Sequence, residues 1–184
     1  MTSLTQQAKD YLTQQIHSGD IVIDATAGNG FDTAFLAKQV GQTGMVYAFD
    51  IQQQAITETQ RLLEAESLTP QVTLHLKSHA QMKQTIPEKY HQKISIVMFN
   101  LGYLPGSDKT CITTATSTIP ALQQCVELLK DDGALSIMLY PGHPGGQTET
   151  KAVLEWIKKL PDHWPIKQVT TPGPHWLLIH KVKT

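Results

Sequence analysis

The sequence is poor in residues that would suggest disulfide bonds or strong attraction of polyanions. Its 184 residues include two cysteines, Cys111 and Cys125, and only one of its 15 basic residues, Arg61, is an arginine. Two thiols in a chain of this length indicate reduced cysteines and not a disulfide framework. The formal net charge is -1 at pH 7. Overall charge therefore gives no argument for a nucleic-acid partner.

Long hydrophobic runs are also missing. No apolar stretch approaches the roughly 18 residues that suggest a membrane-spanning helix, and the amino-terminal segment lacks the apolar core of a signal peptide. No linker, internal repeat or low-complexity segment divides the chain. We therefore expect a cytoplasmic protein without a membrane partner. Residues 1–184 should form one domain, with a helix in 1–19 packed on it, and the sequence leaves a homodimer open.

What is present is an alternation of apolar strands with helical periodicity. The predicted strands are 21–26, 45–50, 72–77, 94–100, 134–140, 166–171 and 175–181. The predicted helices are 3–18, 31–40, 52–66, 79–86, 113–129 (kinked or interrupted near Pro120) and 147–160. This order predicts an α/β, Rossmann-like fold, with a mostly parallel seven-stranded sheet and helices on both faces. The last two strands should form an antiparallel hairpin.

Ligands of such sheets bind beyond the carboxyl ends of the strands, so the segments that follow the strands carry the information. The segment 24–33, DATAGNGFDT, leaves the first strand and enters a helix. Gly28 and Gly30 permit a tight turn and close approach of a ligand. Thr33 occupies the position of the third glycine that a dinucleotide pyrophosphate favours. A nucleoside with an amino-acid tail and no phosphates does not need that glycine. The alternative is a plain strand-to-helix turn.

Two further strand ends could hold the nucleoside. Asp50 closes the second strand about twenty residues after the glycines, where a carboxylate can accept hydrogen bonds from both ribose hydroxyls. It could instead cap a helix, and enzymes that use NAD share this residue. Ser78 and His79 follow the third strand and could reach the adenine, although a histidine there could also be structural.

The segment after the fourth strand suits an amine nucleophile. Asn100 begins NLGYLPGSDK at the position where amino-methylating enzymes carry an Asn/Asp-Pro-Pro-Tyr loop. The Asn100 side-chain carbonyl and the Leu101 main-chain carbonyl could accept the two N–H bonds of the amine, which orients its lone pair. The ring of Tyr103 could stack on the attached base. The alternative is a polar loop in which Asn and Gly form turns.

Taken together, the segments DATAGNG-x-DT, FDIQ-x-x-AI, SHAQM, MFNLGYLPG-x-DK and YPGHPGG resemble the rRNA methylase family. The resemblance is clearest over residues 20–155. Its best-understood members are tRNA 5-aminomethyl-2-thiouridine methyltransferases. One departure is Phe31, where many relatives carry histidine, and the carboxyl-terminal segment TTPGPHWLLIHK also differs from the family pattern.

The resemblance implies a class I methyltransferase fold that uses S-adenosyl-L-methionine, releases S-adenosyl-L-homocysteine and needs no metal. It implies methylation of 5-aminomethyl-2-thiouridine at the tRNA wobble position, so the partner would be the anticodon loop of a tRNA. The loop after the fifth strand would form the opposite lip of the substrate pocket. His143 there could contact the base or its phosphate, or remove a proton; a plain loop histidine is the alternative.

The expected site residues fall into three groups. The candidates for cofactor binding are Asp24, Ala27, Gly28, Asn29, Gly30, Asp32, Thr33, Asp50, Ile51, Gln52, Ser78 and His79. The candidates for substrate binding are Gly102, Lys109, Tyr140 and Gly142. The candidates for catalysis are Asn100, Leu101, Tyr103 and His143. An rRNA substrate, an NAD-linked oxidoreductase and a catalytically silent cofactor-binding module remain as alternatives.

Overall fold

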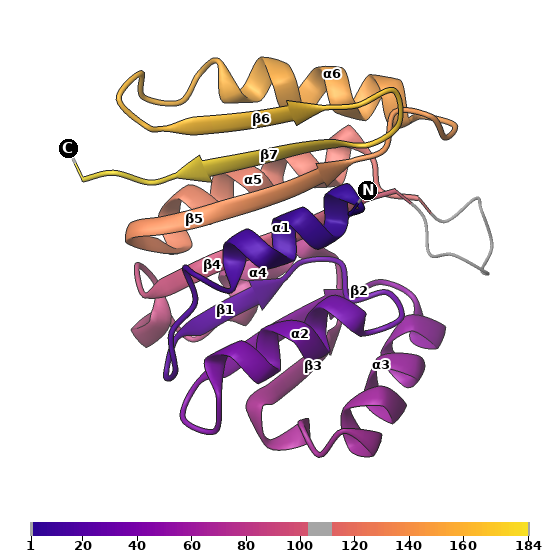
Figure 1. Cartoon of the computed structure of the whole chain (residues 1–184), viewed down its shortest axis with the longest axis vertical. Coiled ribbons are helices and arrows are strands. Elements are labelled where there is room, and N and C mark those ends of the chain that lie inside the picture. The colour runs from indigo at the N-terminus through magenta and orange to yellow at the C-terminus, as the bar shows by residue number, and fades with distance from the viewer. Residues whose placement is uncertain (1, 103–111, 184) are drawn as a thin grey trace.

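The computed structural model describes residues 2–102 and 112–183, and their strands form one seven-stranded sheet (Figure 1). The strand order is β3-β2-β1-β4-β5-β7-β6. The strands are β1 (Ile21–Asp24), β2 (Met45–Asp50), β3 (Val72–Leu76), β4 (Ile94–Leu101), β5 (Leu129–Leu139), β6 (Ile166–Thr170) and β7 (His175–His180). Strands β1 to β5 pair in parallel, whereas β7 is antiparallel to both β5 and β6. The predicted sheet and its terminal hairpin are confirmed.

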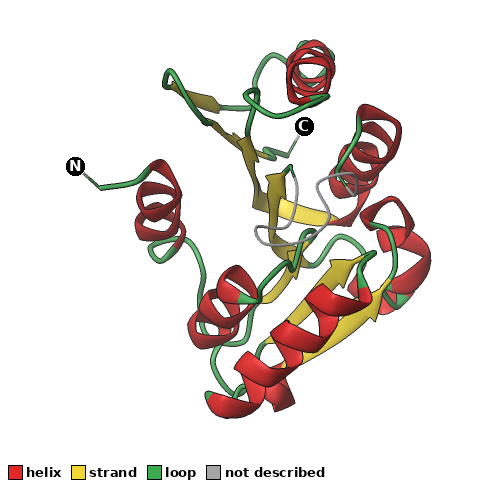
Figure 2. Cartoon of the chain, turned by 90° about the vertical axis from the view of Figure 1, so that its right-hand side faces the viewer, coloured by secondary structure: helices red, strands yellow, loops and turns green. Residues whose placement is uncertain are grey.

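Helices cover both faces of the sheet, as Figure 2 shows. The α-helices are α1 (Leu4–Leu12), α2 (Phe31–Val40), α3 (Gln53–Ala65), α4 (Met82–Thr85), α5 (Ala115–Leu128) and α6 (Gly146–Ile157). Three short 3-10 helices, η1 (Thr69–Gln71), η2 (His79–Gln81) and η3 (Glu88–Tyr90), complete the elements. No helix in the described part of the chain is long and apolar enough to cross a membrane.

The alternation of side chains along each strand divides the core into two layers. Val22, Ile96 and Met98 pack with α1, α2 and α3 on one face, while Ile23 and Phe99 pack with α4, α5 and α6 on the other. Successive strand residues point to opposite faces, so each central strand is apolar on both sides. This explains why the strands read as continuous hydrophobic runs.

Several predicted boundaries were wrong. The first helix ends at Leu12 and not at residue 18, because the N–H groups of Gln14 and Gln15 bond three residues back, to Tyr11 and Leu12, and tighten the last turn. The first strand ends at Asp24, whose side chain accepts the N–H of Thr26 and starts the turn.

The later boundaries also moved. Strand β5 begins five residues early, at Leu129, and its pairing with β4 shifts register between Leu129 and Ala134. The predicted helix 79–86 is divided between η2 and α4, and α5 continues through Pro120. The carboxyl ends of the strands that carry the predicted site move by at most two residues, the largest shift being at β1, which ends at Asp24.

Candidate active site

The glycine turn after β1 has a left-handed backbone at both predicted positions. Gly28 and Gly30 have φ angles of 55° and 83°, which side chains of L-residues rarely adopt. A Cβ atom on Gly30 would lie 2.9 Å from the Thr59 Cα atom of α3. The Thr59 hydroxyl also donates to the carbonyl of Gly28, at 3.1 Å. The turn is therefore pressed against α3, where only glycine fits.

Asp50 links the end of β2 to this turn. Its Oδ2 accepts the main-chain N–H of Gly28 at 3.0 Å, and its Oδ1 accepts that of Gln52 at 2.9 Å. Each carboxylate oxygen has two lone pairs, so both oxygens of Asp50 can accept a further hydrogen bond. The carboxylate is thus held in place by the backbone and remains able to bind hydroxyl groups.

Asp24 lies beneath the turn. Its side chain is fully buried and accepts the Thr33 hydroxyl at 2.6 Å and the Thr26 N–H at 3.0 Å. Burial, together with the charge of Asp32, raises the pKa of Asp24 to about 7, although the two hydrogen bonds oppose this rise. Asp24 and Thr33 therefore support the turn from the inside of the protein.

His79 presents a neutral ring to the site. Burial lowers the pKa of His79, so the ring is uncharged near neutral pH. Nδ1 lies 3.1 Å from the carbonyl oxygen of Ala25, which can only accept, so Nδ1 carries the proton. Nε2 is then an acceptor, and it is buried without a hydrogen-bond partner among the described residues. Ser78, beside it, caps η2 by accepting the N–H of Ala80.

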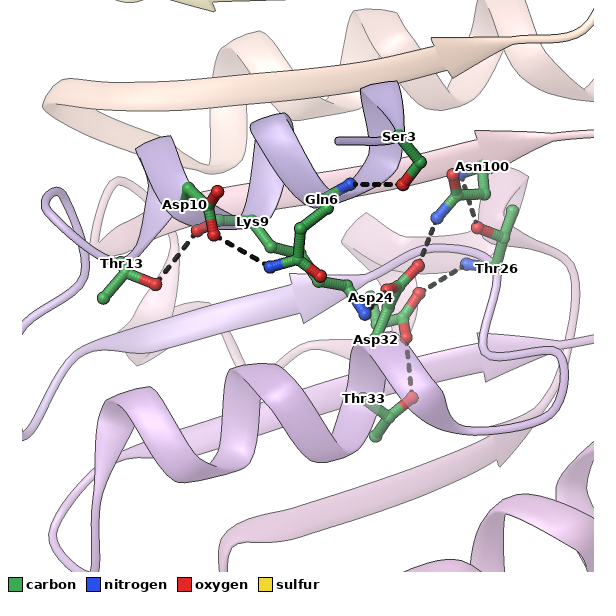
Figure 3. A network of polar contacts seen from close by, with 10 residues as sticks. All are labelled: Ser3, Gln6, Lys9, Asp10, Thr13, Asp24, Thr26, Asp32, Thr33 and Asn100. Atoms are coloured by element: carbon green, nitrogen blue, oxygen red, sulfur yellow. Dashed lines mark hydrogen bonds and ion pairs between the residues drawn. The ribbon is translucent and has the colours of Figure 1, made fainter. Parts of the chain in front are cut away.

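Asn100 is held through both its main chain and its side chain (Figure 3). The main-chain N–H donates to the Thr26 hydroxyl at 2.8 Å. The side-chain nitrogen donates to Oδ2 of Asp32, whose Oδ1 lies 2.6 Å from Nζ of Lys9. The Asn100 side-chain oxygen is buried and has no partner among the described residues. Asn100 thus offers one hydrogen-bond acceptor that the fold itself does not use.

The loop after β5 meets the end of β4. Nδ1 of His143 lies 2.8 Å from the carbonyl oxygen of Pro144. A Cβ atom on Gly146 would lie 3.0 Å from two atoms of the His143 ring, and one on Gly102 would lie 3.5 Å from its Nε2. The His143 ring is therefore packed beside both glycines. Tyr140, at the start of this loop, is 36% exposed.

A cavity of about 1110 Å³ joins these segments at the carboxyl ends of the strands. The predicted site residues that line it are Ala27, Gly28, Asn29, Asp32, Asp50, Ile51, Gln52, Ser78, His79, Asn100, Gly102, Tyr140, Gly142 and His143. Four predicted residues do not line it: Asp24, Gly30, Thr33 and Leu101. Tyr103 and Lys109 lie outside the described residues. In the described ranges, no three His, Cys, Asp or Glu side chains are grouped so that they could hold a metal ion.

Sequence reasoning missed several residues that line the cavity. Thr5 and Lys9 come from α1, and Gly173 and Pro174 come from the turn between β6 and β7. Neither segment follows a parallel strand, so the rule that located the other residues could not find them. Lys77 follows β3 directly, and the same rule could have included it.

Comparisons with known proteins agree with this geometry. A tRNA (mnm(5)s(2)U34)-methyltransferase of Arabidopsis thaliana chloroplasts is 40% identical over a 165-residue alignment that covers 85% of this chain. This chain spans 60% of the length of that relative. A crystal structure of a "putative rRNA-methylase" from Clostridium thermocellum is 36% identical, with a TM-score of 0.93 and 99% of each chain covered.

A second solved structure contains a ligand. It is a "putative methyltransferase" from Streptococcus mutans in complex with SAH, 33% identical, with a TM-score of 0.85 and 99% of each chain covered. Residues 46–171 match the model of the family described as "Putative rRNA methylase". The fold is that of class I S-adenosylmethionine-dependent methyltransferases, and the chain belongs to the rRNA methylase family.

Proposed function

We propose that this protein is an S-adenosylmethionine-dependent N-methyltransferase that methylates 5-aminomethyl-2-thiouridine at the wobble position of tRNA. The observation that carries the proposal is the buried side-chain oxygen of Asn100, which has no hydrogen-bond partner in the described part of the chain. It stands at the end of β4, on a cavity shared with the glycine turn and Asp50. The activity for which the Arabidopsis relative is named and the SAH in the Streptococcus structure support the same assignment.

The residues present fit the cofactor. The glycine turn has no room for a Cβ atom at Gly30, and Asp50 keeps free lone pairs for the ribose hydroxyls. The buried, unpartnered Nε2 of His79 can accept a hydrogen bond from an amino group such as that of adenine. When bound, S-adenosylmethionine supplies an electrophilic methyl group on a sulfonium.

Asn100 acts on the substrate amine by positioning it. The amine attacks through its lone pair, so it must be neutral, and the Asn100 oxygen accepts one of its N–H bonds and turns the lone pair toward the methyl group. A nitrogen–carbon bond forms as the sulfur–carbon bond breaks, and the electron pair of the broken bond stays on sulfur. The methylated amine then loses one proton to water, so the reaction needs no strong base from the protein. If His143 were instead the base, the outcomes expected for the variants would differ.

The direct test measures methyl transfer by Asn100→Ala. Turnover on tRNA that carries 5-aminomethyl-2-thiouridine should fall about 10²-fold or more, as for a misplaced reactant, while binding of S-adenosylhomocysteine stays nearly unchanged. An obligatory base at His143 predicts instead that His143→Ala abolishes turnover and that high pH partly restores it. Wild-type rates in Asn100→Ala would remove the central residue from this mechanism.

The RNA substrate is tested separately. Mass spectrometry of tRNA nucleosides, from cells with and without the gene, should show 5-methylaminomethyl-2-thiouridine replaced by its unmethylated precursor. An unchanged tRNA profile accompanied by a methyl group lost from rRNA would favour the rRNA alternative. The cytoplasmic location and the anticodon-loop contact stay predictions that the same cells can test by fractionation and cross-linking.

A further inference from the structure

Asp32 stands between two groups that sequence reasoning did not connect. It is the second residue of α2 and receives Lys9 of α1 on one oxygen and the Asn100 side chain of β4 on the other (Figure 3). Side-chain exposure is only 18% for Lys9 and 14% for Asp32. Three elements distant in sequence therefore meet in one partly buried polar chain that ends at Asn100.

This arrangement fixes which way the Asn100 amide faces. A carboxylate only accepts hydrogen bonds, so the side-chain group turned toward Asp32 must be the NH₂. The oxygen of the same amide must then face away from Asp32, and it is this oxygen that is buried without a partner among the described residues. A rotated amide would bring its oxygen against the carboxylate, where the two acceptors repel each other.

Lys9 supplies a positive charge that balances the carboxylate of Asp32. Asp32 lies close enough to the fully buried Asp24 for its charge to contribute to the raised pKa of Asp24. Two ionised carboxyl groups so near each other in a partly buried place repel each other, and both the raised pKa of Asp24 and a cation beside Asp32 reduce this repulsion. Lys9 is the cation within 4 Å of Asp32 among the described residues.

We propose that Asp32 and Lys9 are positioning residues that hold the Asn100 amide with its oxygen toward the substrate amine. The inference rests on the function proposed above, because it assigns that oxygen the task of accepting an amine N–H. Neither residue needs to touch the reacting atoms. The amino-terminal helix α1 would then be a working part of the site, and Asp32, expected from the sequence to bind the cofactor, would act through Asn100.

The kinetic test is a double-mutant cycle. Asp32→Ala should lower single-turnover methylation of 5-aminomethyl-2-thiouridine tRNA by about 10²-fold, and Lys9→Met by about 10-fold. Affinity for S-adenosylhomocysteine should change less than about twofold in both. Adding Asp32→Ala to Asn100→Ala should cost nothing more, because two residues that act as one unit are not additive. If the rate losses of Asp32→Ala and Asn100→Ala multiplied in the double variant, the two residues would act independently and the proposal would be overturned.

The cycle needs matched variants. Asp32→Asn keeps the shape of the side chain but can face Asn100 with either its oxygen or its NH₂, so an intermediate loss of about 10-fold is expected. This variant also serves if Asp32→Ala does not fold. Lys38→Met is the control, since Lys38 lies on the same helix, is exposed and pairs with Glu66 away from Asn100. Its turnover should equal that of the wild type.

A second measurement does not depend on the reaction. In ¹⁵N-labelled protein, one side-chain amide signal that is absent in Asn100→Ala should exchange slowly with solvent, because its NH₂ is hydrogen-bonded to Asp32. That protection should be lost in Asp32→Ala and kept in Lys38→Met. An unprotected signal in the wild type would overturn the proposal. A protected signal without methylation of the tRNA would leave the amide contact intact and contradict the proposed function.

Discussion

Asp50 performs a structural task and, in the proposed function, a binding task at the same time. Its two oxygens each accept a main-chain N–H, one from the glycine turn and one from the start of α3. A ribose would meet a carboxylate whose position is already fixed, so little ordering is required on binding. This is why a strand-end aspartate at this spacing predicts nucleoside binding better than an isolated aspartate does.

The first residue-scale prediction concerns that carboxylate. Asp50→Ala should weaken binding of S-adenosylhomocysteine by about 2–4 kcal/mol, since charge-assisted hydrogen bonds contribute about 1.5–3 kcal/mol each and water compensates in part. Isothermal titration calorimetry measures the change. The exposed Glu88→Ala is the control and should bind as the wild type does. Equal affinity in Asp50→Ala would mean that the ribose lies elsewhere in the cavity.

The second residue-scale prediction follows from the buried carboxyl of Asp24. Its pKa is about 7 in the folded protein, whereas an aspartate in an unfolded chain has its ordinary pKa of 3.8. Between these values the folded state holds a proton that the unfolded state has lost. The contribution of Asp24 to stability therefore falls as pH rises from about 4 to about 7, by on the order of 4 kcal/mol at most.

Urea unfolding at pH 5 and pH 8 tests this sign. Asp24→Asn carries no titrating group at this position, so it should lose less stability between the two pH values than the wild type loses. Asp162→Asn, a change at an exposed site, should keep the wild-type difference. If Asp24→Asn and the wild type showed the same pH dependence, Asp24 would have to be ionised in the folded protein throughout this range.

At the scale of elements, the order of strands and helices could be predicted because each element has its own local pattern. Asn100 and Asp50 could be found because a strand end is visible in the sequence. The Lys9–Asp32 ion pair could not, since only the packing of α1 and α2 on the same face of the sheet brings these two residues together. The length of α1 was wrong for a related reason: Ile16 is apolar and buried, yet it lies after the helix has ended.

Glu149 shows the same limit. This buried carboxylate in the first turn of α6 accepts the hydroxyl of Thr113 at 2.8 Å and that of Thr118, on α5, at 2.6 Å. Glu149 therefore connects α6, the helix after the His143 loop, both to Thr113 just before α5 and to Thr118 within α5. Nothing in the local sequence distinguishes Glu149 from an exposed helical glutamate.

The element-scale prediction is that Glu149→Ala lowers the free energy of unfolding by about 2–4 kcal/mol, because two hydroxyl groups lose a charged acceptor. Urea denaturation gives the value. Glu155→Ala, on the same helix, should have little effect because Glu155 is exposed and its ion pair with Lys158 lies at the surface. Equal stabilities of the two variants would show that Glu149 does not join α6 to α5.

At the scale of the whole molecule, charge sets how an RNA can be bound. The net charge of -1 provides no general attraction for a polyanion. In the proposed function, binding of tRNA would therefore depend on a few lysines near the cavity. Lys9 is already paired with Asp32, whereas Lys77 is exposed, lines the cavity and lies 3.4 Å from the hydroxyl of Thr85. Lys77 is the better placed of the two to meet a phosphate.

The last prediction is a shallow dependence of tRNA affinity on salt. With two or three phosphate contacts and about -0.7 per contact for single strands, the slope of log affinity against log salt should be roughly -2. Lys77→Ala should make it shallower by about 0.7 and weaken binding to all tRNA sequences alike. Lys89→Ala should not, because Lys89 lies in η3, just before β4 and thus toward the amino ends of the parallel strands, whereas the cavity lies at their carboxyl ends. Fluorescence anisotropy across a salt series measures both slopes, and a slope steeper than about -5 would require a basic surface that this charge distribution does not provide.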